Sequence, residues 1–325
     1  MRIDPAIDRL RRDPAPQLDA QAALEAVRDG WRRSGRVAAL LEELGGYGSG
    51  AAIADCPLLD SALSDLALAQ GFVDALVSPM VRQLIGRPLG HVPFRHQYAR
   101  GLGVLQLAEA NGAALSLLCY EASGGGREGR AETVCFAGGE RRELCLAGAA
   151  DARFFEILRA EPQRAELDWE TRRIVRGDAL AFLGPRHARI VDSPLRRMVM
   201  LRLSRGDRAP APTREYRIAD GMLVHRASGD RAESRDEMAA AVLGAMRRAD
   251  AAPVLAGIAG AAGSDHFRWQ ALCQALALDT ATGFETLAAI AGDTADALAA
   301  PAGALRASLI ERHASLARWS RPCRA

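Results

Sequence analysis

The spacing of apolar residues changes twice along the chain, and the two changes divide it into three regions. Between 17 and 85 apolar residues recur at helical spacing, as Leu18, Ala22 and Leu24 do. Between 101 and 203 the period falls to two, which is typical of strands, and after 229 it is helical again. The pattern therefore predicts an α+β protein with a helical region over 1–90, a β domain over 91–228 and an α-helical domain over 229–325.

Short apolar runs in the central region alternate with turn residues. Asn111-Gly112 stands between two such runs and predicts a β-hairpin. Further strands are expected over 132–136, 141–146, 153–158, 165–175, 179–183, 188–191 and 197–203. That many short strands at regular spacing favour an antiparallel β-sandwich or small barrel. We expect 86–100 to be an irregular connector and the glycine-rich stretch 45–50 to form flexible turns.

The last third of the chain predicts a series of short helices. Ala- and Leu-rich segments at 235–249, 251–261, 265–277, 281–291 and 301–318 are joined by brief turns. Ser234 and Glu237 have the spacing of a capping box, so the first of these helices is expected to begin there. The arrangement resembles a HEAT-like array of stacked helix pairs.

Composition excludes several classes of enzyme. The chain has no lysine, so all 42 basic residues are arginine. Without a lysine the chain cannot form a Schiff base with a substrate or cofactor, which excludes pyridoxal phosphate enzymes and lysine aldolases. A P-loop lysine is absent as well, which excludes Walker-type NTPases. The net charge is only +2, which argues against nucleic acid as a partner.

Cysteine spacing and hydropathy bear on the compartment. None of the six cysteines has the spacing of a zinc site. The first residues carry charges without the apolar run of a signal peptide. No segment approaches the roughly 18 consecutive apolar residues of a membrane span. We therefore expect a cytoplasmic protein with reduced cysteines and no membrane partner.

The stretch 172–203 is the most informative part of the sequence. Gly177-Asp178 opens its middle strand, and Pro185 precedes His187. This segment resembles the second conserved motif of the cupin superfamily, in which Gly-Asp opens a strand and a proline precedes a metal-binding histidine. The strand pattern extends the resemblance over about 101–205. It implies a cupin-like barrel with helical flanks, and two copies pairing through an unfilled sheet edge into a homodimer.

The resemblance also implies where a metal would bind. In metal-binding cupins an earlier motif supplies two more histidines and a glutamate, but the equivalent stretch here, 115–121, has no histidine and offers only Cys119 and Glu121. The connector supplies His91 and His96, which would have to reach over a barrel mouth to join His187. A candidate set for Fe(II) or another divalent metal is thus His91, His96, His187 and Glu121, with Glu109 as an alternative carboxylate.

Two functions remain open at this point. In the first, the barrel is degenerate and binds a small molecule or a protein partner without doing chemistry, through the barrel mouth or the helical array. The missing histidines of the first motif favour this reading. In the second, the protein is an oxidoreductase, a non-haem iron oxygenase that uses the histidines named above. A DNA-binding sensor is a third class, against which the near-neutral charge argues.

Overall fold

The computed structural model describes residues 13–99, 101–122, 131–207 and 211–316. The stretch 1–12, on which the expectation of no signal peptide rests, lies outside them. The described chain splits into two compact units. One runs up to residue 207 and includes Glu215–Val224, and the other holds 211–214 and His225 onward. None of the helices in the described ranges combines the length and apolar character needed to cross a membrane.

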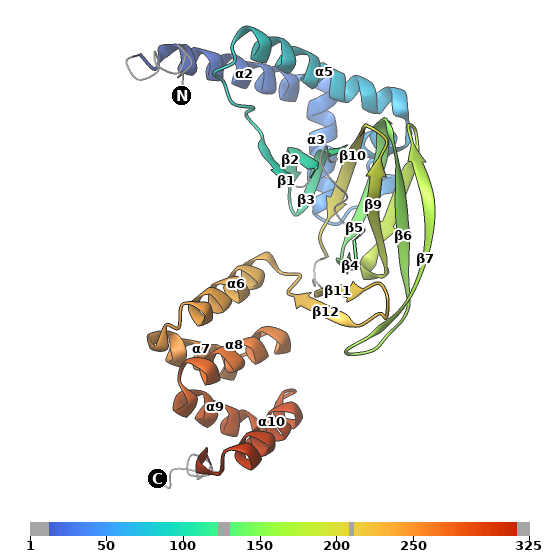
Figure 1. Cartoon of the computed structure of the whole chain (residues 1–325). Helices are drawn as coiled ribbons and strands as arrows, with labels where there is room; N and C mark the ends of the chain where they lie inside the picture. The colour runs from blue at the N-terminus through green and yellow to red at the C-terminus, as the bar shows by residue number, and fades with distance from the viewer. Residues whose placement is uncertain (1–12, 100, 123–130, 208–210, 317–325) are drawn as a thin grey trace. The chain divides into compact units, whose positions relative to one another are not determined.

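The described residues up to 227 form helices and three antiparallel sheets (Figure 1). The helices are α2 (Ala15–Arg33), α3 (Gly35–Gly48), α4 (Pro57–Ser64) and α5 (Leu66–Gly86). A six-stranded sheet has the order β1 (Arg95–Ala99), β2 (Leu102–Ala110), β3 (Ala113–Glu121), β10 (Arg197–Arg205), β5 (Glu140–Ala147), β8 (Ala179–Leu183). Two three-stranded sheets are β7 (Ala165–Val175), β6 (Ala149–Ala160), β9 (His187–Pro194), and β12 (Leu223–Ala227), β11 (Thr213–Arg217), β4 (Thr133–Phe136). The antiparallel β domain predicted from the period of two is confirmed.

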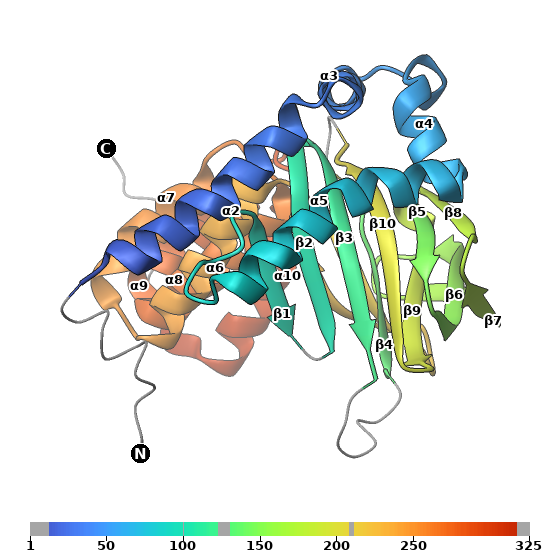
Figure 2. The ribbon, with the colours of Figure 1, turned by 90° about the horizontal axis from the view of Figure 1, so that it is seen from above.

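The six-stranded sheet has two different apolar faces. Leu115, Leu144 and Leu203 point to one face and pack with residues of α2 to α5 in the largest core of the unit. Leu118 and Met200, one residue out of step, point to the other face and pack against β6, β8 and β9. Figure 2 shows α5 running across the strands of this sheet. The helices of 17–85 and the sheet therefore share one hydrophobic core.

The turn that joins β2 to β3 is the hairpin predicted from Asn111-Gly112. Both residues have positive φ, 48° and 85°, which the tight two-residue turn requires. The Asn111 side chain donates to Gly45 O at 3.1 Å and to Ser49 Oγ at 2.9 Å, so the turn docks on the end of α3. The expectation of flexible turns over 45–50 is wrong in its first part, because α3 continues through Gly48.

A cluster of three side chains ties α3 to the sheet at the same place. The Tyr47 hydroxyl donates to Glu140 at 2.7 Å, and Arg205 contacts Glu140 at 2.9 Å while its guanidinium lies 3.9 Å from the centre of the Tyr47 ring. Arg205 also donates to the carbonyl oxygens of Tyr47 and Ala51, each at 2.7 Å. The helix end is thus satisfied by the sheet instead of by solvent.

Two other expectations need correction. The connector expected over 86–100 contains strand β1, whose five residues are all exposed and so lack alternation. The capping box at Ser234 is not used, because the helix begins three residues earlier at Arg231, with the Asp230 side chain accepting from Ala232 N and Glu233 N. Glu237 is instead buried and accepts a hydrogen bond from Ser228 N at 3.0 Å.

The second unit is helical, as expected. Its helices are α6 (Arg231–Ala245), α7 (Ala252–Gly260), α8 (Asp265–Leu278), α9 (Thr280–Gly292) and α10 (Ala299–Arg312). They share a single core around Leu255, Leu272, Phe284 and Leu287, all of which are almost completely buried. A HEAT-like repeat remains a prediction.

The close contact between α3 and the β2–β3 turn gives a test of this packing. A Cβ added at Gly48 would lie 2.3 Å from Ala110 O, whereas one added at Gly46 would meet nothing within 4 Å. We expect Gly48→Ala to lower the free energy of unfolding by about 1–3 kcal/mol, as overpacking does. The control Gly46→Ala should raise it by up to about 1 kcal/mol through helix propensity. Guanidinium denaturation measures both, and equal stability of the two variants would contradict the contact.

Candidate functional site

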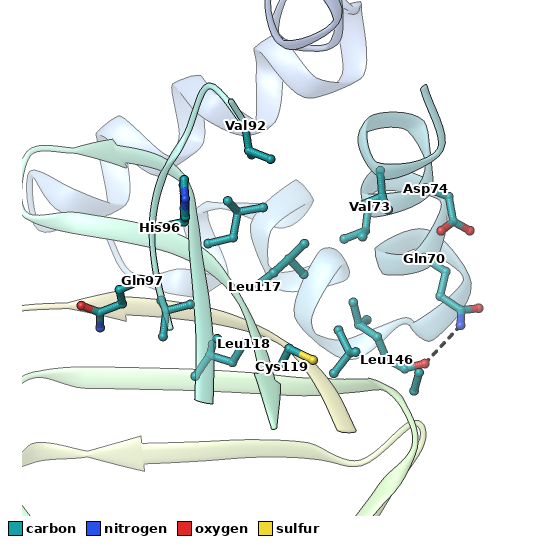
Figure 3. Close-up of a pocket in the computed structure, with 16 residues that line it drawn as sticks. Gln70, Val73, Asp74, Val92, His96, Gln97, Leu117, Leu118, Cys119 and Leu146 are labelled. Atoms are coloured by element: carbon teal, nitrogen blue, oxygen red, sulfur yellow. Dashed lines mark hydrogen bonds between the residues drawn. The ribbon is translucent and has the colours of Figure 1, made fainter. Parts of the chain in front are cut away.

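A cavity of about 540 Å³ lies between α5 and the helix-facing side of the six-stranded sheet. Figure 3 shows α5 on one side of it, the connector and β1 on the other, and β3 at its base. Its wall is mainly apolar. Its apolar lining residues include Val73, Val77, Leu105, Leu117, Leu146 and Val199.

Helix α5 supplies one wall because of its residue spacing. Gln70, Val73, Asp74 and Val77 recur at the i, i+3, i+4, i+7 positions of one helix face. The helix is fixed at its start by Asp65, whose carboxylate accepts hydrogen bonds from Ala67 N at 2.8 Å and Leu68 N at 3.1 Å. That N-cap sits just over one turn before Gln70, so the wall begins in a well-determined part of the helix.

The strands form the floor, and a glycine keeps it open. Leu117, Cys119 and Val199 share the helix-facing side of β3 and β10. Gly103 on β2 is paired with Cys119. A Cβ at Gly103 would make only ordinary contacts, with Tyr98 at 3.5 Å and with Cys119 at 3.7 Å. The missing side chain therefore leaves space in the cavity without straining the strand.

Few polar groups line the cavity. Gln70 donates to Leu146 O at 3.2 Å and accepts from Arg176 at 2.9 Å, so both ends of its amide are engaged. His96 Nδ1 lies 2.9 Å from Phe94 O, on the element that leads into β1. No arginine stands among the described lining residues, although arginine is the basic residue of the whole chain.

Cys119 is the thiol of the cavity floor. Burial raises the pKa of this thiol above its ordinary value, with Arg197 opposing the rise and Glu121 adding to it. The group is therefore a neutral thiol at neutral pH, which is a poor nucleophile and a poor metal ligand.

The residues named as metal ligands lie on separate parts of the first unit. His91 is in the connector, where its backbone N–H donates to Gln21 at 3.0 Å. Glu121 ends β3, where it pairs with Arg197 and accepts from the Tyr98 hydroxyl at 3.1 Å. His187 begins β9 in a different sheet, with Nε2 at 3.8 Å from Glu156.

These positions do not form a shared site. His96 is the only one of the four that lines the cavity, and Glu109 accepts from the Gln106 amide on β2 instead. Among the described residues no group of three or more His, Cys, Asp or Glu side chains is placed to hold a metal ion. His187 on β9 contacts Glu156 on β6, whereas Glu121 on β3 pairs with Arg197 on β10, so each of these side chains has its partner within its own sheet.

The comparisons with known proteins concern the β domain. No protein-family model matches the sequence, and no curated protein sequence matches it. Solved structures that match include the Momordica charantia 7S globulin, with a TM-score of 0.26, 13% identity, and coverage of 39% of this chain and 36% of that one. An oxalate decarboxylase variant from B. subtilis matches with a TM-score of 0.25, 12% identity, and coverage of 35% and 27%.

A cupin superfamily protein from Desulfitobacterium hafniense matches with a TM-score of 0.24, 17% identity, and coverage of 34% of this chain and 84% of that one. For the Momordica charantia globulin, the matched part of this chain corresponds to only about a third of the globulin's length. Of the three neighbours, the Desulfitobacterium hafniense protein is described as a cupin superfamily protein.

The raised pKa of Cys119 predicts a pH profile for its alkylation. Only the thiolate reacts with iodoacetamide, so the rate at Cys119 should keep rising through pH 9, the ordinary thiol pKa, before it levels off. Mass spectrometry of the modified peptide follows the rate, with Cys119→Ser as the assignment control. At each pH the alkylation rate is divided by the plateau rate at high pH. This ratio reports the ionisation of the thiol independently of how accessible the thiol is to the reagent. A plateau already reached at pH 7.5 would contradict the buried, neutral thiol.

Proposed function

We propose that the chain is a binding protein that holds an uncharged, mainly apolar small molecule in the cavity beneath α5. The observation that carries the proposal is the composition of the cavity: apolar side chains of α5, β2, β3, β5 and β10 line it, with polar groups confined to a few positions. Its volume of about 540 Å³ is within the range of sites for drug-sized ligands.

The electrostatics of the lining favour a ligand without negative charge. Asp74 is the one carboxylate of the wall, and the described lining offers no guanidinium to pair with an anionic ligand. Burying an unpaired charge costs several kcal/mol, so an anion would be disfavoured here. An apolar ligand instead gains roughly 25 cal/mol for each Å² of its surface removed from water.

Binding without chemistry is supported by the state of the polar groups. Cys119 is a neutral thiol, because burial raises its pKa above the ordinary value. The oxygenase alternative stays a prediction, and no contact among the described residues favours it. A small-molecule binding site also agrees with the missing histidines of the first cupin-like motif.

Filling the cavity tests the proposal. N-phenyl-1-naphthylamine is a neutral, apolar dye whose fluorescence rises in an apolar environment, and we expect it to bind the protein saturably. Gly103→Leu should weaken that binding at least about tenfold, equivalent to 1.4 kcal/mol, because the new side chain occupies the floor beside Cys119. The variant's Tm shows whether it is folded.

Gly30→Leu is the matched control, since it adds the same side chain where a Cβ would meet nothing within 4 Å. It should leave dye binding unchanged. Equal loss of binding in both variants, or saturable binding that persists in a folded Gly103→Leu protein, would overturn the assignment of the ligand to this cavity.

A further inference from the structure

Three guanidinium groups converge on one carboxylate on the opposite face of the six-stranded sheet from the cavity. Glu143 on β5 exposes none of its side chain. Its Oε2 is 2.7 Å from Arg189 Nη2, from β9, and its Oε1 is 2.6 Å from Arg202 Nη2, from β10. Arg141, two residues before Glu143 on β5, places its Nε 3.6 Å from the same Oε1.

One carboxylate neither balances the charge of three guanidinium groups nor accepts hydrogen bonds from all of their N–H groups. Both of its oxygens are used by Arg189 and Arg202, and the Tyr120 hydroxyl takes a further hydrogen bond from Arg189 Nη2 at 3.1 Å. The Arg189 side chain is only 3% exposed, yet its Nε and Nη1 have no hydrogen-bond partner among the described residues. Arg141 Nε is also buried and has no hydrogen-bond partner among the described residues, since its contact with Glu143 at 3.6 Å is an ion pair.

Three buried or partly buried positive charges around one carboxylate destabilise the fold unless a further negative group balances them. A guanidinium keeps its charge under all ordinary conditions, so the cluster cannot relieve the excess by losing a proton. Burial lowers the pKa of Arg141, and the like charges of Arg202 and Arg189 lower it further, partly offset by Glu143. Buried N–H groups without acceptors cost free energy as well. Negatively charged oxygen atoms would balance the excess positive charge and would also accept hydrogen bonds from the unpaired N–H groups.

Two arginines of the cluster are partly exposed to solvent. Arg202 and Arg141 expose 26% and 30% of their side chains, whereas Glu143 and Arg189 are almost fully enclosed. Phe182 supports Arg141 from below, with the guanidinium carbon 4.4 Å from the centre of its ring. The donors are therefore held by neighbours from three strands and are not free to turn away into water.

We propose that Arg141, Arg189 and Arg202 form a binding site for a small oxyanion, the carboxylate or phosphate group of a small molecule, inside the β domain. Guanidinium N–H groups match the oxygen spacing of both groups. Glu143 then sets the affinity, because its negative charge orients the three arginines while it competes with the incoming anion. The site is separate from the cavity beneath α5, and neither proposal depends on the other.

Thermal unfolding tests the site with inorganic phosphate and with acetate as probes. Each is titrated against chloride at constant ionic strength, so that general screening is the same in every sample. We expect a saturable rise in Tm for the wild-type protein. A rise with phosphate identifies a phosphate site, and a rise with acetate alone identifies a carboxylate site. A Tm that responds to neither anion overturns the proposal.

Two variants separate a binding site from a structural ion cluster. Arg141→Gln removes a partly exposed donor and should weaken the apparent affinity at least about tenfold. Glu143→Gln keeps the shape of the side chain but removes the competing charge. That variant should unfold at a lower Tm in chloride and show a larger anion-dependent rise than wild type. A structural cluster would give the lower Tm without the larger rise, and this outcome also overturns the proposal.

Arg173→Gln is the matched control, because Arg173 makes an exposed pair with Asp151 and its loss changes the net charge equally. Its response to the anions should be that of the wild type. An equal loss of response in Arg173→Gln and Arg141→Gln would show a general charge effect and would contradict the assigned site. If Glu143→Gln does not fold, the anion-dependent rise in Tm of Arg141→Gln, compared with that of Arg173→Gln, still distinguishes a binding site from a general charge effect.

Discussion

The alternation of side chains along β3, β10 and β5 is the constraint on which the rest of the first unit depends. Leu117, Leu146 and Val199 face the helices and make one surface apolar, whereas Glu143 and Arg202 face the other way. Because the period of a strand is two, a shift in register by one residue would bring these charges under α5. The same strands can therefore carry an apolar cavity on one face and a charged cluster on the other.

The helix layer turns the apolar face into a cavity. Its attachment is polar at one end, where Tyr47, Glu140 and Arg205 join α3 to the sheet, and apolar elsewhere. Burial raises the pKa of Tyr47, and the Glu140 carboxylate that accepts its hydrogen bond adds to the rise, so the hydroxyl keeps its proton and remains a donor. These contacts fix the helices relative to the sheet. The space next to Gly103 is therefore present in the folded protein before any ligand binds.

Sequence patterns predicted most of the helices and strands, but they did not predict the site. The period of two predicted the strands and Asn111-Gly112 predicted the hairpin, because both signals are local. Strand β1 was missed because an exposed edge strand has no alternation to detect. The stretch 70–77 was predicted as helix, but its place above the sheet is set by tertiary packing. Proximity of His91, His96 and His187 required a long-range arrangement that no local spacing encodes.

The central claim is that an apolar ligand occupies the space between α5 and the sheet. Methyl-labelled Leu and Val residues allow a direct test by nuclear magnetic resonance with N-phenyl-1-naphthylamine as the probe. The account predicts shifts concentrated at the methyl groups of Val73, Val77 and Leu117, with those of Leu255 and Leu272 in the second unit unmoved. Shifts that centre on the second unit, or that leave all three cavity residues unchanged at saturation, would contradict it.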